Sequence, residues 1–443
     1  KVLPTQPSTQ PKFTVLRGTE GFWRVGQSAD GVWWFVSPDG QADFLNAVTT
    51  VQPFQRGRSA DGPEFVSRDW RAGASGSEDD LNAWARATLA RVRHVGFKSL
   101  GAWCHPAFHQ LDVPMSRDLN VLAYMNGLGM KFYDPRWAAR AEEIIRKQVE
   151  PLRDNRNLVG YYIDNELDWS DAGLGPGVHF DALAADDPNR LKVIEVMRSL
   201  WPTVEQFNSA WGAQIGSFEE IAQWKTLPHH RRAYGRLYTG WLARFAEDYF
   251  QLHCGLVRKY DPNHLILGVR FKAYMVPEVV RASRDYTDVQ SINLYPGDGK
   301  LDREMLTKMH EMSGQPVVIG EYSFHALDGR SGNRNTVGFS AQVLDQQARA
   351  DGYRLFTTRM ARVPFLVGAD WFQWMDEPPS GRTSDGEDVN FGVVDIDDRP
   401  YEKLVDAIRQ TTPLLNALHA GSVSDSRLDV WREIGRASCR ERV

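Results

Sequence analysis

Two stretches decide the fold, LVGYYIDNELDW (residues 158–169) and PVVIGEYSF (residues 316–324). Each begins as an apolar run of strand length and reaches a glutamate, Glu166 in the first and Glu321 in the second. Strands of a parallel sheet are buried on both faces, so they carry apolar runs and deliver polar groups at their carboxyl ends. We therefore predict that the two carboxyl groups meet at one end of a parallel sheet.

Eight strand-like runs lie along the chain, and helical patterns separate nearly all of them. The runs are residues 44–51, 97–103, 120–125, 158–166, 264–271, 289–295, 316–321 and 365–374. Helical patterns cover residues 81–94, which follow Ser77 as an N-cap, and residues 136–152 and 347–362. This alternation predicts an α/β fold, a (β/α)8 TIM barrel, in which Glu166 closes strand four and Glu321 closes strand seven.

A carboxylate at a strand end often serves only as a helix cap or an ion-pair partner. Two of them at one barrel mouth have a further use. One carboxylic acid can protonate a glycosidic oxygen while a carboxylate roughly 5 to 5.5 Å away attacks the sugar with retention of configuration. The pair Glu166 and Glu321 therefore predicts glycosidase chemistry, with Glu166 protonated and Glu321 kept ionised by hydrogen bonds.

The residues around the two glutamates resemble the clan A glycoside hydrolases. Asn165 precedes Glu166 as an asparagine precedes the clan's acid/base, and Glu321 matches its nucleophile. The resemblance implies that Asn293 and Tyr295, in SINLYP, bind the substrate and the nucleophile. It also implies that Trp371 and Trp374, at the end of strand eight, form an aromatic platform under the sugar.

A closer resemblance is to the exo-acting β-agarases of glycoside hydrolase family 50. It rests on GYYIDNELDW, HLILGVRF, WFQWMDEPPSGR (residues 371–382) and DGEDVNFG (residues 385–392), and it extends from about residue 22 to about residue 419. It implies a retaining hydrolase of a β-linked galactan. The chain departs from these agarases in its short Trp-rich lead-in and in residues 323–334.

The chain divides into four segments, the third of which carries an insertion. We expect a linker or truncated region at residues 1–20, a β-rich lead-in at 21–43 and the catalytic barrel at 44–432, with a helical insertion at 181–260. Residues 433–443 are expected to be a non-native tail, because IGRASCRERV back-translates to a sequencing-library adapter, which would make Cys439 non-native. The Pro/Thr/Gln-rich start fits an extracellular or periplasmic protein.

Other chemistries lack their signatures. Residues 46–50 (NAVTT) offer no His-x-His for a metal, and neither a dinucleotide glycine fingerprint nor a GxSxG elbow is present, so we expect no cofactor. His105 and His325 are expected at the barrel mouth as ligands of sugar hydroxyls. Cys104 and Cys254 leave disulfide status open.

The composition points to a carbohydrate partner. A formal net charge of −5 argues against nucleic acid and anionic membranes, and no run approaches the roughly 18 apolar residues of a membrane span. The 15 Trp and 14 Tyr suit stacking on sugar rings. Oligomeric state stays open.

Three alternative functions stay open beside the agarase-like hydrolase. They are a β-galactosidase acting on small galactosides, a hydrolase of sulfated galactan and an inactive barrel that only binds glycans. The sulfated substrate is suggested by arginines near the mouth, Arg270, Arg330, Arg334 and Arg382, whose other role is pairing with acids such as Asp385. Asp385 and Glu387 are also expected to bind substrate.

The mode of attack can be read from the loops. We expect residues 181–260, 323–336 and 376–390 to converge on one rim of the barrel and enclose a pocket. A pocket admits only chain ends, so we expect exo-action that releases one short oligosaccharide.

Overall fold

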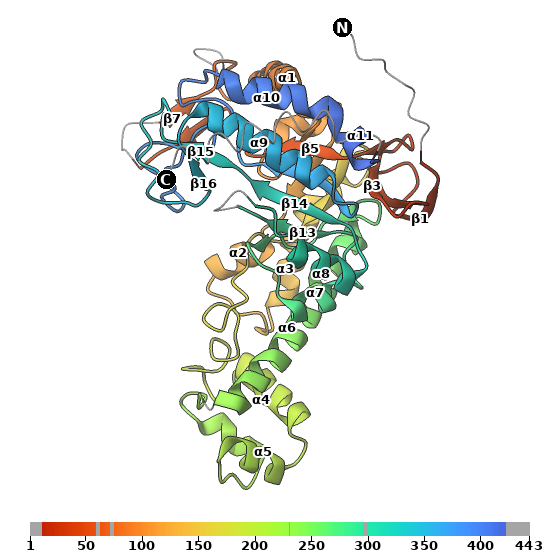
Figure 1. Cartoon of the computed structure of the whole chain (residues 1–443). Helices are drawn as coiled ribbons and strands as arrows, with labels where there is room; N and C mark the ends of the chain where they lie inside the picture. Colours follow the sequence, from red (N-terminus) through yellow and green to blue (C-terminus); the bar gives the residue numbers. More distant parts are fainter. Residues whose placement is uncertain (1–10, 59–62, 71–74, 230, 296–299, 422–443) are drawn as a thin grey trace, which may run out of the picture.

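The computed structural model describes residues 11–58, 63–70, 75–229, 231–295 and 300–421. A curled parallel sheet with helices around it forms the body of the molecule, and a helical lobe extends away from the body (Figure 1). The expected tail at residues 433–443, with Cys439, and residues 1–10 of the expected linker lie outside the described residues.

The central sheet has nine strands, all paired in parallel. Their order across the sheet is β11 (Leu265–Ile266), β10 (Leu158–Tyr162), β9 (Met115–Asp118), β8 (Ser99–Leu100), β5 (Leu45–Val48), β17 (Leu366–Trp371), β14 (Val317–Tyr322), β13 (Gln290–Asn293) and β12 (Phe271–Lys272). Every residue of β5, β10, β13, β14 and β17 is buried, as the apolar runs predicted.

The predicted (β/α)8 barrel is wrong, because this sheet is open and curled, with β11 and β12 as its two edges. Residues 264–271 were expected to form one strand. Gly268 and Arg270 instead take left-handed backbone conformations, with φ of 83° and 47°, and interrupt the run. The first half pairs with β10 and the second half with β13, which gives nine strands in place of eight.

The third predicted strand is also corrected. Residues 120–125 begin a helix, α2 (Val121–Gly127), and the strand at this place in the sheet is β9. Asn120 has a φ of 51°, which turns the chain, and Asp164 Oδ1 then accepts a hydrogen bond from Leu122 N at 2.8 Å. Val121, Leu122 and Met125 are buried on one side of this helix. A short apolar run cannot by itself distinguish a strand from a buried helical turn.

The predicted helices around the sheet are confirmed. In α1 (Glu78–Val95) the hydroxyl of Ser77 accepts a hydrogen bond from Asp80 N, and Gly96 ends the helix with a φ of 114°. The patterns at residues 136–152 and 347–362 form α3 (Trp137–Val149) and α9 (Gln346–Ala361). The remaining helices of the body are α7 (Pro277–Ser283), α8 (Arg303–Ser313), α10 (Glu402–Thr411) and α11 (Leu415–His419), with short 3-10 turns at Pro106–Gln110, Glu150–Leu152 and Thr412–Leu414.

Small sheets flank the body. An antiparallel sheet precedes the central one and consists of β1 (Phe13–Arg17), β2 (Arg24–Ser28), β3 (Trp33–Val36) and β4 (Ala42–Asp43). Its first strand lies in the segment expected to be a linker. A hairpin of β6 (Phe54–Arg56) and β7 (Pro63–Val66) follows β5. After β14, strand β15 (Phe324–Ala326) pairs with β16 (Ala341–Val343).

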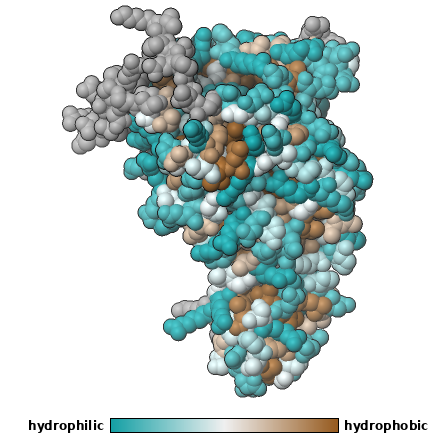
Figure 2. Space-filling view, turned by 90° about the vertical axis from the view of Figure 1, so that its right-hand side faces the viewer, coloured by the Kyte–Doolittle hydropathy of each residue, from teal (hydrophilic) through white to brown (hydrophobic). Residues whose placement is uncertain are grey.

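The lobe is helical, as expected for residues 181–260. It contains α4 (Pro188–Leu200), α5 (Val204–Trp211), a 3-10 turn (Phe218–Gln223) and the 30-residue α6 (Arg231–Tyr260), which runs back to the body. Buried aromatic side chains fill it, including Trp201, Phe207, Trp211 and Phe218. On the face shown in Figure 2 the lobe carries hydrophobic patches among hydrophilic residues.

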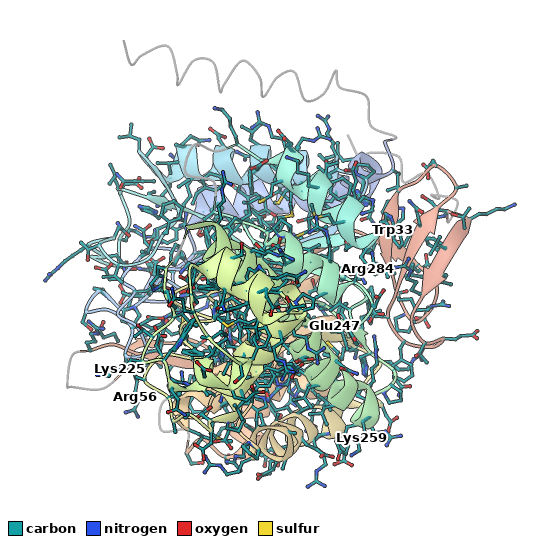
Figure 3. All side chains as sticks on the ribbon, turned by 90° about the horizontal axis from the view of Figure 1, so that it is seen from below. Trp33, Arg56, Lys225, Glu247, Lys259 and Arg284 are labelled. Atoms are coloured by element: carbon teal, nitrogen blue, oxygen red, sulfur yellow. The ribbon has the colours of Figure 1, made fainter. Side chains whose placement is uncertain are left out.

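Seen from below, α6 crosses the body, with Glu247 on it and Lys259 near its end, while Trp33 lies in the N-terminal sheet at one side (Figure 3). Lys259 Nζ pairs with Glu142 at 2.5 Å and Glu247 accepts a hydrogen bond from Tyr286, so the helix is tied to α3 and to the segment after α7. None of the helices in the described part of the chain is long and apolar enough to cross a membrane. Cys104 and Cys254 are both free thiols.

Candidate active site

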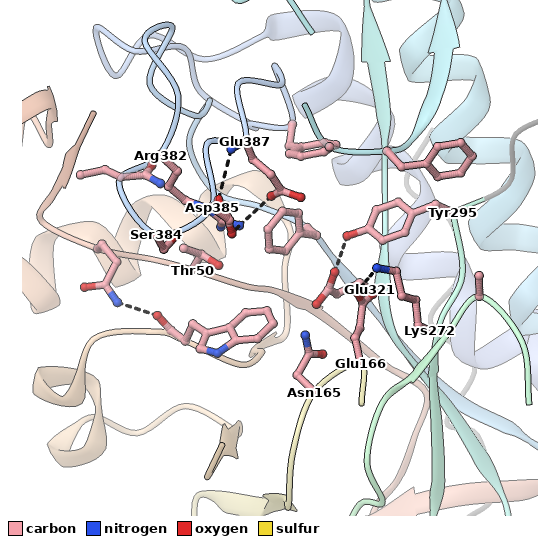
Figure 4. Close-up of a pocket in the computed structure, with 18 residues that line it drawn as sticks. Thr50, Asn165, Glu166, Lys272, Tyr295, Glu321, Arg382, Ser384, Asp385 and Glu387 are labelled. Carbon is pink, nitrogen blue, oxygen red and sulfur yellow. Dashed lines mark hydrogen bonds and ion pairs between the residues drawn. The ribbon is translucent and has the colours of Figure 1, made fainter. Parts of the chain in front are cut away.

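The carboxyl ends of the parallel strands place the two glutamates. Glu321 lies in β14 directly opposite Asn293 of β13, and Leu294 N donates to Glu321 O at 2.8 Å. Glu166 follows β10, and its backbone N donates to Arg270 O at 3.1 Å. Segments from opposite parts of the sheet therefore bring both carboxyl groups to one cavity (Figure 4).

The backbone at these strand ends is strained. Thr50, Trp103, Glu166, Arg270 and Ala273 all have φ between 47° and 60°, although none is glycine. Each such conformation costs about 1 to 3 kcal/mol, and such residues gather at functional sites because the surrounding fold must hold them there. All but Arg270 line the cavity.

The cavity has a volume of about 710 Å³, within the usual range for a ligand site. Its walls combine carboxylates with aromatic rings. The lining residues are Thr50, Gln52, Gln55, Trp103, Asn165, Glu166, Lys272, Ala273, Tyr295, Glu321, Gly338, Phe339, Phe372, Arg382, Ser384, Asp385, Glu387 and Phe391.

The two oxygens of Glu321 have different surroundings. Oε2 accepts a hydrogen bond from the hydroxyl of Tyr295. Oε1 lies 2.8 Å from a guanidinium nitrogen of Arg270 but accepts no hydrogen bond from any residue that the structure describes. One oxygen is thus held by a neutral donor, and the other lies against the positive charge of Arg270.

Burial dominates the acidity of Glu321 and raises its pKa to about 7. The charge of Arg270 and the hydrogen bond from Tyr295 lower this pKa, while the charge of Glu166 raises it further. We expected hydrogen bonds to keep Glu321 ionised throughout the neutral range. Burial instead places its titration near neutral pH.

Glu166 is partly exposed and has two polar neighbours. Asn293 Nδ2 donates to its Oε1 at 3.0 Å and also to Asn165 Oδ1 at 3.0 Å. Lys272 Nζ lies 3.7 Å from its Oε2 (Figure 4). Asn293 does not line the cavity but orients both residues of the Asn165-Glu166 pair.

Arg270 lies under the cavity floor. It is fully buried, with Asp118 Oδ2 at 3.2 Å and the ring of Trp103 at 4.2 Å from its guanidinium carbon. Its partners include Glu321, Asp118, the carbonyl oxygen of Gly320 and the rings of Trp103 and Tyr162. The prediction that Arg270 contacts substrate is corrected, because a side chain with no exposed surface reaches substrate only through Glu321 and Trp103.

The 376–390 loop supplies the acidic wall. Arg382 pairs with Glu387 at 2.6 Å, with Asp385 at 2.7 Å and with the buried Glu377 at 3.3 Å. Burial raises the pKa of Glu377 well above its usual value and also raises that of Glu387. The guanidinium of Arg382 is thus enclosed by carboxyl groups of its own loop.

Four predicted site residues lie away from the cavity. Trp371 and Trp374 are 0% and 1% exposed, and their rings pack in the core, so the predicted platform is wrong. His105 accepts a hydrogen bond from Ala107 N and caps a 3-10 turn, while His325 is buried against Ser340 at 2.7 Å. None of the four lines the cavity.

The aromatic wall comes from residues that sequence reasoning passed over, Trp103, Phe339, Phe372 and Phe391. The ring of Phe372 lies 6.1 Å from Trp103 and 5.3 Å from Phe391, centroid to centroid. A signal for Phe372 existed, because adjacent side chains of a strand point to opposite faces, and a core position for Trp371 sends Phe372 the other way. The peptide bond after Phe372 is cis.

Two expected neighbours of the mouth, Arg330 and Arg334, also lie outside the cavity lining. Arg330 pairs with Asp395 at 3.0 Å. No described residue of 181–260 or of 323–336 lines the cavity, so the expected convergence holds only for the 376–390 loop. Gly338 and Phe339, just beyond residue 336, line the cavity instead. Among the described side chains, no group of three or more His, Cys, Asp or Glu could hold a metal ion.

With this geometry in hand, the chain can be compared with known proteins. No known family profile matches it. β-Agarase B of Vibrio sp. (strain JT0107) is 26% identical over 480 residues, covering 89% of this chain and 48% of that protein. β-Agarase A of the same strain is 27% identical over 474 residues, covering 91% of this chain and 47% of that protein.

A solved exo-β-agarase structure has a TM-score of 0.75 to this chain at 25% identity, covering 92% of this chain and 67% of the other. The chain thus spans about half the length of the curated relatives it matches. These comparisons support the agarase resemblance inferred from the motifs, whereas clan A membership stays a prediction.

Replacing Tyr295 by Phe tests the electrostatics of the site. The ring of Tyr295 can stay beside Phe391, and only the hydroxyl that lowers the pKa of Glu321 is lost. We expect the pKa of Glu321 to rise by about 1. Carbon NMR titration of the glutamate carboxyls measures it, with Glu321→Gln identifying the resonance. An unchanged or lower pKa in a folded Tyr295→Phe protein would contradict this account.

Proposed function

We propose that this chain is a retaining, exo-acting glycoside hydrolase that cleaves β-galactosidic bonds in an agarose-type galactan and releases a short oligosaccharide. The observation that carries the proposal is that Glu166 and Glu321 face one cavity in different environments. The similarity to β-agarases along most of the chain supports it independently.

Glu321 acts as the nucleophile. Tyr295 and Arg270 hold its carboxylate, and one carboxylate oxygen attacks the anomeric carbon. The new bond from this oxygen to carbon forms as the bond from carbon to the leaving oxygen breaks. Arg270 stabilises the carboxylate before attack, because its charge favours the ionised form.

Glu166 acts as the acid and then the base. It gives its proton to the leaving oxygen, and the part of the galactan that carries this oxygen departs as an alcohol. Glu166 next takes a proton from water, which attacks the glycosyl ester, restores Glu321 and releases sugar of retained configuration. Asn293 keeps the carboxyl of Glu166 oriented through both steps.

The charge of the cavity favours a neutral substrate. Arg270 and Arg382 are held by carboxyl groups, and Lys272 lies beside Glu166. A sulfate group would need a cation that is not already committed, and it would meet Glu166, Asp385 and Glu387 in the cavity walls. A neutral agarose-type galactan is therefore favoured over a sulfated one.

The shape of the cavity supports exo-action. The 376–390 loop forms one wall, and Gly338 and Phe339 contribute beside it. Gln55 of β6 and Gln52, just before β6, line another part of the cavity. A volume of about 710 Å³ suits the end of a chain and a short product. A galactan polymer cannot cross a membrane, so we propose an extracellular or periplasmic location.

Incubation with agarose, carrageenan and lactose tests the proposal directly. We expect cleavage of agarose, with one short oligosaccharide, a disaccharide, present from the earliest time points. Lactose as the preferred substrate would favour the β-galactosidase alternative, and carrageenan would favour the sulfated one. Agarose binding without cleavage of any substrate would mean a glycan-binding protein. An early ladder of mixed sizes would overturn exo-action.

The roles of the two glutamates predict a specific rescue. The Glu166→Ala enzyme should regain turnover of an activated aryl glycoside when azide is added, because an aryl leaving group needs no acid and azide needs no base. The glycosyl azide should retain its configuration. Since Glu321 must be ionised, wild-type kcat/KM should fall as pH decreases through about 7. Initial release of the inverted anomer by the wild type, seen by proton NMR, would contradict retention.

A further inference from the structure

Phe339 combines exposure with a place in the cavity wall. It is 64% exposed, the largest value among the exposed large hydrophobic side chains of the described residues. Leu344 in the same segment is 61% exposed but does not line the cavity. A large apolar ring left in water at the edge of a binding site points to a ligand that covers it.

The backbone on the N-terminal side of Phe339 is held by Asp388, a buried residue of the 376–390 loop. The carboxylate of Asp388 accepts hydrogen bonds from Thr336 N and Oγ1, both at 2.7 Å, and from Val337 N at 2.8 Å. Asp388 N in turn donates to Val337 O at 3.1 Å. The segment before Phe339 is therefore fixed to the acidic wall.

Gly338 brings Phe339 close to that wall. It has a φ of 108°, and a Cβ atom at this position would lie 2.9 Å from Val389 Cγ2 and 3.4 Å from Glu387 Cγ. Only glycine accommodates both the backbone conformation and this contact. On the other side, Ser340 Oγ contacts His325 Nδ1 at 2.7 Å, and β16 begins at Ala341. Contacts on both sides thus hold the backbone that presents the exposed ring.

We propose that Phe339 is an outer sugar-binding platform on which a residue of the galactan beyond the cleaved bond stacks. The inference rests on the proposed function and extends it to the part of the substrate outside the reacting pair. The C–H faces of a neutral sugar match a flat apolar ring, and the ring is continuous with the cavity that holds Glu166 and Glu321. A protein partner would need on the order of 800 Å² of surface on each side, far more than one side chain offers.

A platform outside the reacting centre acts mainly on long substrates. Covering one face of the ring removes apolar surface from water only when the substrate reaches it. Loss of the ring should therefore reduce kcat/KM for an oligosaccharide that spans the cavity. It should reduce kcat/KM for an activated aryl glycoside, which stays near the catalytic pair, much less.

The test compares an agarose-derived hexasaccharide with an aryl glycoside. Phe339→Ala should lower kcat/KM for the hexasaccharide about tenfold, and that for the aryl glycoside several times less. Phe339→Trp should retain hexasaccharide activity, because it keeps a flat ring. Leu344→Ala, the matched control, should change neither substrate. Thermal melting of each variant checks that the fold is intact.

Three outcomes would overturn the platform. They are an equal effect of Phe339→Ala on both substrates, no effect on either, and a loss in Leu344→Ala as large as in Phe339→Ala. Binding of the hexasaccharide to the Glu321→Gln protein, with and without Phe339→Ala, separates this proposal from the one before it. A wild type that neither binds nor cleaves the hexasaccharide would contradict the proposed function. If the protein binds and cleaves the hexasaccharide equally well with and without the Phe339 ring, only the platform proposal is contradicted.

Discussion

The buried ion pair between Arg270 and Glu321 is the interaction on which the site depends. A guanidinium with no exposed surface must be surrounded by partners, and here they are Glu321, Asp118 and the ring of Trp103. These partners come from three different places along the sheet. Arg270 itself stands at the break between β11 and β12, so the feature that leaves the sheet open also supplies the central cation. The short segment around Arg270 therefore determines both the open edges of the sheet and the positive charge beside Glu321.

Arg270 lies near more than one buried carboxyl group, and its single charge cannot neutralise all of them. Burial raises the pKa of Asp118 to about 6 and those of Glu321 and Asp370 to about 7, and Arg270 lowers all three. Arg270 thus acts on three buried carboxyl groups at once. The pKa of Glu321 depends on its burial, on the charge of Arg270 and on the nearby charge of Glu166. The packed sheet also holds strained backbone conformations at the cavity. They occur at Thr50, Trp103, Glu166 and Ala273.

Much of the site could be predicted from the sequence because parallel strands place their polar ends together. This reasoning placed Glu166 and Glu321 together, and the clan resemblance added Asn165, Asn293 and Tyr295. Arg382, Asp385 and Glu387 came from the charged loop expected at the mouth. The errors have physical causes. A break at Gly268 cannot be read from an apolar run, and residues 120–125 fit a strand or a buried helical turn equally well. Trp371 and Trp374 were assigned from the clan resemblance, but the pleat of the strand decides which neighbour faces the cavity, and that neighbour is Phe372.

The central claim is that Glu321 forms a covalent bond to the sugar. A galactosyl fluoride with fluorine at the 2-position slows both steps and lets the glycosyl enzyme accumulate, since the leaving fluoride needs little acid assistance. Peptide mass spectrometry of the trapped enzyme should find the fluorosugar on Glu321, with labelling lost in Glu321→Gln and retained in Glu166→Gln. A label on another residue, or hydrolysis of the reagent without any covalent adduct, would contradict the account.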